Sequence, residues 1–315
     1  MPANHKTLFS GLLRTQQFLM GLRISRAIRK IPLAYPAYTF LYQRWVPGEQ
    51  FFVNSQGHKL FLDPRDMGMA RALLLSGGAW EEAETRLFSS FVKEGMTVVD
   101  VGANVGYYTL LAARLVGEKG KVFAFEPSSD NFALLKRNVE ENGYKNVVLV
   151  PKAVSDRSAK ARLLIDRASS GSHSLSASRG GADFVDVETV SLDEYFAGGL
   201  ERIDVLKIDA EGAEMAILNG MGRLLERNTN LTLLTEFSPG AIREFGCSPE
   251  EYIWRLKSHE FQIYPIYEEQ EKFRALDIEQ VAELVASLAE GEPARRSLNL
   301  LCVKGNDTAL FGDRA

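Results

Sequence analysis

The sequence has few of the residues from which disulfide frameworks and metal-binding cysteine motifs are built. Its 315 residues include two cysteines, Cys247 and Cys302, and their spacing matches no metal site. The four histidines are also too scattered to indicate a zinc site. So few cysteines fit a reducing compartment, and we expect the protein to be cytoplasmic.

Long hydrophobic runs are also missing. No stretch reaches the roughly 18 uncharged apolar residues that a membrane span needs. Residues 31–42 are uncharged but too short, and Pro32 and Pro36 interrupt them. The net charge of −4 is unevenly distributed, because residues 1–50 hold seven Lys and Arg against one acid, Glu49. Residues 51–315 therefore hold 30 of the 37 basic and 40 of the 41 acidic residues, a charge of −10 that argues against a nucleic-acid partner.

The basic N-terminal segment has an amphipathic pattern. Four leucines can share one helical face and three basic residues another: Leu8, Leu12, Leu19 and Leu22, and Arg23, Arg26 and Lys30. This pattern suits peripheral contact with an anionic membrane such as the inner membrane surface, but packing on the body of the protein or on a second subunit is favoured. We expect residues 1–79 to form a helical extension plus a small hairpin, Phe51–Val53 with Lys59–Leu62, ahead of a main domain at 80–315.

The dinucleotide-binding pattern G-x-G-x-x-G is absent as well. In its place, a buried strand ending at Asp100 and Val101 runs into a G-x-N-x-G turn formed by Gly102, Asn104 and Gly106. Glycines let the backbone approach a ligand, and the next helix offers its first amide groups. The loop therefore predicts S-adenosylmethionine (SAM) rather than NAD. Asp100 would brace this loop or reach the amino-acid part of SAM through water.

A second strand follows at the distance that nucleotide binding requires. Residues 121–125 read as buried strand and end at Glu126. An acid about 20 residues past a glycine loop can accept hydrogen bonds from both ribose hydroxyls. Glu126 is assigned this role, and the alternative is a solvated acid at a strand end.

From residue 80 onward, strand and helix patterns alternate, which predicts an α/β fold with a mostly parallel sheet and helices on both faces. Strands are expected at Thr97–Val101, Val122–Phe125, Val147–Val150, Val205–Ile208, Leu231–Thr235, Phe261–Ile266 and Leu298–Val303. Helices are expected at Tyr107–Leu115, Asp130–Asn142, Ala213–Arg227, 249–259 behind a Ser248 cap, and Ile278–Leu288.

One insertion interrupts the alternation. Two short strands, Arg162–Ile165 and Phe184–Val190, flank a serine- and glycine-rich run at 168–181. A long loop of this kind acts as a lid or a binding loop, although a solvated surface loop is equally compatible. His173 within it is a candidate catalytic base.

Acidic residues mark the predicted carboxyl ends of the central strands. Asp209 and Glu211 follow one strand, and Glu236 follows the next. Ligands of open α/β sheets bind at this edge, where a carboxylate could deprotonate or orient an acceptor hydroxyl. Alternatively, Asp209 and Glu236 could bind Mg²⁺ that holds the acceptor oxygen. Lys207 lies two residues before Asp209, faces the same side and needs an acidic partner if buried.

These motifs together resemble the FkbM family of SAM-dependent methyltransferases. The similar stretches are residues 99–108 (VDVGANVGYY), 125–127 (FEP) and 206–214 (LKIDAEGAE), within a match from about Trp80 to Val303. The family usually has a bulkier aliphatic residue at the position of Ala210. The resemblance implies the class I, Rossmann-like methyltransferase fold with a seven-stranded sheet, and methylation of hydroxyl groups on polyketides and sugars.

The resemblance also assigns roles to individual residues. Gly102, Asn104 and Gly106 would line the SAM site, and Glu126 would hold the ribose. Ala153 and Val154 would flank the adenine, and Glu81 would approach the methionine end of SAM.

The leading interpretation is thus a SAM-dependent O-methyltransferase acting on a sugar, glycolipid or polyketide hydroxyl. A nicotinamide oxidoreductase is disfavoured because the G-x-G-x-x-G loop is missing. The non-enzymatic alternative is a SAM-binding scaffold that its basic N-terminal segment docks on a membrane or a glycan assembly complex.

Overall fold

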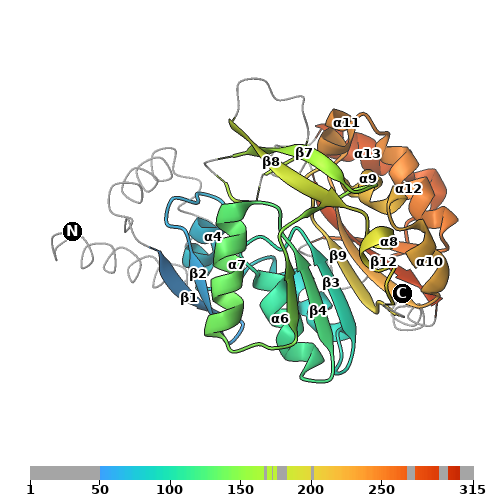
Figure 1. Ribbon diagram of the computed structural model, residues 1–315. Coiled ribbons are helices and arrows are strands. Elements are labelled where there is room, and N and C mark those ends of the chain that lie inside the picture. Colours follow the sequence, from blue (N-terminus) through green and yellow to red (C-terminus); the bar gives the residue numbers. More distant parts are fainter. Residues whose placement is uncertain are drawn as a thin grey trace. The chain divides into compact units, whose positions relative to one another are not determined.

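Figure 1 shows the computed structural model of the chain, which describes residues 50–166, 169–171, 173–175, 183–199, 202–267, 274–290 and 297–305. The chain divides into two compact units, Met1–Trp80 with Arg167–Gly171, and Glu81–Asp166 with Ser172–Ala315. The helical extension predicted at the N-terminus falls in residues 1–49, outside the described part. The predicted domain boundary after residue 79 stays a prediction, because a division by contacts does not test independent folding.

The smaller unit contains the predicted hairpin. Strand β1 (Phe51–Ser55) pairs antiparallel with β2 (His58–Leu62), and α4 (Met69–Ser76) follows. The turn at Gln56 and Gly57 has positive φ at both residues, as a two-residue hairpin turn of type I′ requires. Ser170 joins this unit because its backbone N–H and its hydroxyl both donate to the carboxylate of Asp66, at 3.2 and 2.8 Å.

The larger unit is built on a seven-stranded sheet in the order β11-β12-β10-β9-β3-β4-β5. Six strands are parallel, and β12 runs antiparallel to both of its neighbours. The mostly parallel sheet predicted from the sequence is therefore confirmed. In chain order the strands are β3 (Thr97–Val101), β4 (Lys121–Phe125), β5 (Val147–Val150), β9 (Val205–Ile208), β10 (Leu231–Phe237), β11 (Gln262–Ile266) and β12 (Leu298–Lys304).

Helices cover both faces of this sheet. On β3, Val99 and Val101 join the buried cluster that includes residues of the C-terminal helices, whereas α6 covers Asp100 on the opposite face. Helix α5 packs on α6, and α11, α12 and α13 pack on one another. The helices of this unit are α5 (Glu82–Phe91), α6 (Tyr107–Val116), α7 (Ser129–Glu141), α8 (Leu192–Tyr195), α9 (Glu214–Asn219), α10 (Gly222–Arg227), α11 (Pro239–Glu244), α12 (Pro249–Ser258), η1 (Ile278–Gln280) and α13 (Val281–Glu290).

The helix predicted at Ala213–Arg227 is wrong as a single element, because the structure has two helices there, α9 and α10. The break lies at Gly220 and Met221. The carbonyl oxygen of Gly220 accepts a hydrogen bond from the N–H of Asp193 at 3.0 Å. A Cβ on Gly220 would lie 2.2 Å from the carbonyl oxygen of Ser155. Close backbone approach therefore interrupts the helix, and helical periodicity gives no sign of it.

The inserted segment forms a separate three-stranded sheet in the order β6-β8-β7. Its strands are β6 (Ala153–Val154), β7 (Ala159–Ile165) and β8 (Asp183–Val190). Both strands predicted in the insertion are present, and β7 starts three residues earlier than expected. Among the described helices, none is long and apolar enough to cross a membrane.

Candidate active site

The loop after β3 lies directly against the end of β9. The N–H groups of Gly102 and Ala103 both donate to the carbonyl oxygen of Phe125, at 3.0 Å each. Gly102 has φ of +78°, and a Cβ there would lie 1.8 Å from the carbonyl oxygen of Asp209. Only glycine allows this approach. The predicted SAM loop and the predicted catalytic strand end are thus in contact.

Glu126 ties the same loop to the end of β4. Its carboxylate accepts hydrogen bonds from the N–H groups of Asn104 and Ser128, both at 2.8 Å. Burial raises the pKa of Glu126 to about 7, although these two donors lower it. The solvated alternative for Glu126 is wrong, because the residue is buried. Among the described residues, no hydrogen-bond partner reaches the buried side-chain oxygen of Asn104.

Asp100 braces α6. Its carboxylate accepts a 2.6 Å hydrogen bond from the hydroxyl of Thr109. Bracing of the glycine loop itself, or contact with SAM through water, stays a prediction. Burial raises the pKa of Asp100, while the charge of Lys207 and the bond from Thr109 lower it.

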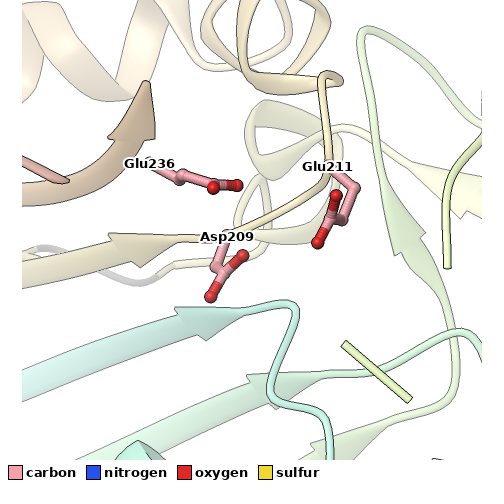
Figure 2. Close-up of side chains that lie close together, drawn as sticks. All are labelled: Asp209, Glu211 and Glu236. Atoms are coloured by element: carbon pink, nitrogen blue, oxygen red, sulfur yellow. The ribbon is translucent and has the colours of Figure 1, made fainter. Parts of the chain in front are cut away.

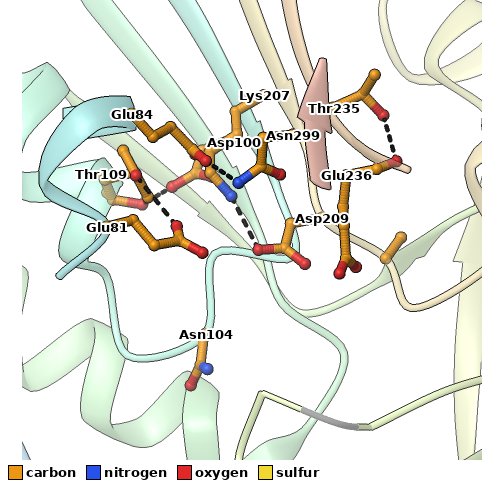
Figure 3. Close-up of polar contacts among 12 residues, drawn as sticks. Glu81, Glu84, Asp100, Asn104, Thr109, Lys207, Asp209, Thr235, Glu236 and Asn299 are labelled. Atoms are coloured by element: carbon orange, nitrogen blue, oxygen red, sulfur yellow. Dashed lines mark hydrogen bonds and ion pairs between the residues drawn. The ribbon is translucent and has the colours of Figure 1, made fainter. Parts of the chain in front are cut away.

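An ion pair between a buried lysine and a partly exposed aspartate lies beside Asp100 (Figure 3). The Nζ of Lys207 lies 3.0 Å from Oδ2 of Asp209 and 4.6 Å from the ring centroid of Tyr108. Burial lowers the pKa of Lys207, but four carboxylates outweigh it and raise the pKa overall: Asp209, Glu84, Asp100 and Glu81. Lys207 therefore stays protonated, and the acidic partner expected for it is Asp209.

Three carboxylates gather at the ends of β9 and β10 (Figure 2). Asp209, Glu211 and Glu236 each present an oxygen within 4.8 Å of the others, and all three side chains are partly buried. Burial and then the charges of Asp209, Glu211 and Glu214 raise the pKa of Glu236 well above its usual range. Three such oxygens can accept a hydroxyl proton, orient a hydroxyl group or bind a hard cation.

The insertion reaches this group through a serine. The hydroxyl of Ser174 donates to the carbonyl oxygen of Glu211 at 2.9 Å. The preceding residue, His173, accepts a hydrogen bond at its Nδ1 from the N–H of Asp166, at 3.2 Å. This bond holds His173 against the end of β7, and its role as a base stays a prediction. Most of the predicted lid, including 176–181, lies outside the described residues.

The remaining predicted site residues lie at the borders of this region. Glu81 directly precedes α5, and its carboxylate accepts a 3.3 Å hydrogen bond from the hydroxyl of Tyr108. Gly106 precedes α6 with φ of +97°. Ala153 and Val154 are buried in β6.

Two further acids of this region are buried, and sequence reasoning missed the first of them, Glu84. Glu84 accepts a hydrogen bond from the side chain of Asn299, 215 residues away, and burial raises its pKa to about 8. Glu214 accepts the N–H groups of Ala210 and Gly212, at 3.2 Å each, within the turn that carries Glu211. Glu81 and Glu84 are three residues apart at the start of a helix, and residues at this spacing are neighbours. This spacing could have identified Glu84 as a residue close to Glu81.

Comparisons with known proteins point to methyltransferases. The model of the methyltransferase FkbM domain matches residues 100–275. A probable cobalt-precorrin-6B C(15)-methyltransferase of Sulfurisphaera tokodaii is 30% identical over 141 residues, covering 44% of this chain and 66% of that protein. Methyltransferase sdnD of Sordaria araneosa is 29% identical over 185 residues, covering 46% and 68%. Hexuronic acid methyltransferase AglP of Haloferax volcanii is 28% identical over 148 residues, covering 46% and 58%.

The chain thus spans 58% to 68% of the length of these relatives. Among solved structures, methyltransferase FkbM from Methylobacillus flagellatus is 13% identical, with a TM-score of 0.41 over 73% of this chain and 52% of that one. A similarity at this level adds nothing to the family match.

Proposed function

Since the chain belongs to the FkbM family of methyltransferases, we propose that it transfers the methyl group of SAM to a hydroxyl group of a sugar, glycolipid or polyketide-type acceptor. The group of three carboxylates beside the glycine loop is the observation that carries this proposal. The similarity to a hexuronic acid methyltransferase supports a sugar among the acceptor classes.

The residues around the glycine loop fit SAM. The buried side-chain oxygen of Asn104 lacks a hydrogen-bond partner among the described residues, so a ligand N–H or O–H would satisfy it. Glu126 would accept from the ribose hydroxyls, while Ala153 and Val154 would flank the adenine. When bound, SAM supplies an electrophilic methyl group on a positively charged sulfur.

Asp209 is the residue to which we assign the main acceptor contact. One of its oxygens is paired with Lys207, which leaves the other to accept a hydrogen bond from the acceptor hydroxyl. Such a bond aligns the hydroxyl oxygen and increases its negative charge as the new bond forms. Glu236 and Glu211 would complete the acceptor site, and His173 is a weaker candidate for the base.

A cation-assisted version uses the same three carboxylates. Asp209 and Glu236 could bind Mg²⁺, since their oxygens and that of Glu211 lie within 4.8 Å of one another. Removing divalent cations with a chelator separates the versions. Loss of methyl transfer that Mg²⁺ restores favours the cation, and unchanged transfer favours direct contact with Asp209.

The test begins with calorimetric titration of SAM and then NAD, followed by a panel of sugar, uronic acid and polyketide alcohols. We expect Asp209→Asn to bind SAM with unchanged Kd and to lose at least about 100-fold in kcat, because the hydroxyl loses its acceptor. The matched control is Glu226→Gln, which changes an exposed acid on α10 and should leave kcat unchanged.

Two results would contradict the proposal. Full activity of Asp209→Asn would remove Asp209 from its assigned role. A wild-type chain that binds SAM but methylates no acceptor of the panel would favour the alternative of a non-catalytic SAM-binding scaffold.

A further inference from the structure

Lys207 occupies a central position in the sheet. It lies on β9, where its register neighbours are Asp100 on β3 and Leu234 on β10. Only 4% of the residue is exposed. Burying an ammonium group costs several kcal/mol unless partners compensate, so the partners of Lys207 indicate what it does.

Most of the carboxylates around Lys207 also have another donor. Asp100 accepts from Thr109, Glu84 from Asn299 and Glu81 from Tyr108. The direct hydrogen bond of the Lys207 ammonium goes to Oδ2 of Asp209, at 3.0 Å. Figure 3 shows Lys207 on one side of the Asp209 carboxylate and Glu236 on the other.

The ammonium group of Lys207 offsets the repulsion that neighbouring acids exert on the Asp209 carboxylate. Glu211 and Glu236 present oxygens within 4.8 Å of the Asp209 carboxylate. Burial, and then repulsion among these acids, favours their protonated forms, and the pKa of Glu236 is accordingly raised well above its usual range. A fixed cation on the opposite side attracts the carboxylate and limits its rotation.

We propose that Lys207 is a positioning residue for methyl transfer: its ammonium group holds one oxygen of Asp209, so that the other stays directed at the acceptor hydroxyl. The ring of Tyr108, 4.6 Å from Nζ, and the flanking strands keep the ammonium group in place. This inference rests on the proposed function, since Lys207 acts through Asp209.

A purely structural role would be to neutralise buried carboxylates. That role predicts a less stable protein with unchanged kcat in the folded fraction. The positioning role predicts a loss of kcat that depends on Asp209, with SAM Kd and acceptor KM little changed. A double-mutant cycle separates the two.

The experiment measures kcat, KM and SAM Kd for Lys207→Met, Asp209→Asn and the double variant, each on protein whose folding is checked by circular dichroism. We expect Lys207→Met to lower kcat about 100-fold, the loss typical of a misplaced catalytic group. The double variant should be no slower than Asp209→Asn. The control is Lys121→Met, which removes an exposed lysine from the opposite end of β4, two strands away from β9 in the sheet, and should retain kcat.

If Lys207→Met does not fold, kcat is measured on Lys207→Arg instead. It keeps the charge but replaces a point donor with a planar fork, so kcat should fall about 10-fold at unchanged SAM Kd. Wild-type kcat in either variant would overturn the inference, as would losses that multiply in the double variant.

Failure of the proposed function would look different. If the wild type binds SAM and methylates no acceptor, the proposed function fails. The hold on Asp209 is then read from crystal structures of the wild type and Lys207→Met, which removes the ammonium group. An Asp209 carboxylate in the same orientation in both would overturn the inference.

Discussion

Gly102 is the residue at which the loop after β3 meets the end of β9. Two independent features require glycine here. Its φ is +78°, and an added Cβ would lie 1.8 Å from the carbonyl oxygen of Asp209. The first feature is conformational and the second is steric. A substitution here therefore disturbs both the predicted SAM loop and the predicted catalytic carboxylate.

We expect Gly102→Ala to lower the free energy of unfolding by about 3 kcal/mol or more, combining left-handed strain with overpacking. Gly143→Ala is the matched control, because Gly143 has φ of +76° and nothing within 4 Å of its Cβ position. It should cost only the strain, about 1–2 kcal/mol. Urea unfolding measures both variants, and equal losses would contradict the steric part of the argument.

At the scale of elements, the junction of α9 and α10 is set by contact with another segment. Gly220 approaches the backbone of Ser155, whereas Gly222, at the start of α10, faces open space. A side chain added at Gly220 would therefore meet neighbouring backbone, whereas one added at Gly222, two residues later, would not. The first is constrained by its surroundings, and the second is not.

We expect Gly220→Ala to destabilise the protein by about 1–3 kcal/mol through overpacking. Gly222→Ala should leave stability unchanged or raise it by up to about 1 kcal/mol, because alanine favours helix. Thermal unfolding of both variants provides the measurement. A stable Gly220→Ala protein would mean that the Ser155 backbone moves aside readily.

For the whole molecule, buried carboxylates make folding stability depend on pH. Burial raises the pKa of Glu126 and Glu214 to about 7 and that of Glu84 to about 8. A raised pKa means that the folded chain binds the proton more tightly than the unfolded chain. The stabilisation is complete below the ordinary value of 4.5 and is lost as pH rises through 7 to 8.

The free energy of unfolding should therefore fall between about pH 5 and about pH 9, with Glu214 contributing about 3 kcal/mol of this fall. Glu214→Gln keeps an acceptor for the N–H groups of Ala210 and Gly212 but cannot ionise, so its pH dependence should be shallower. Urea unfolding across this range measures it. Glu226→Gln, at an exposed position, should keep the wild-type slope, and an equal slope in Glu214→Gln would contradict the prediction.

Local pattern was enough to predict most of the sheet. The strand at Thr97–Val101, the turn at Gly102 to Gly106 and the acid at Glu126 are close in sequence, and their residue types report burial and backbone demands directly. Tight strand–turn–helix units of this kind are encoded within a few residues. The family resemblance depends on the same short stretches, and the family match confirmed it.

The sequence by itself thus determined the fold class, the family and the strand ends that carry acids. Only the tertiary structure decided which acid pairs with Lys207, that Asn299 reaches Glu84, and that Ser174 meets Glu211. It also decided the break at Gly220. The physical reason is that strand and helix periodicity depends on neighbouring residues, whereas ion pairs and close backbone contacts depend on packing between segments far apart in the chain.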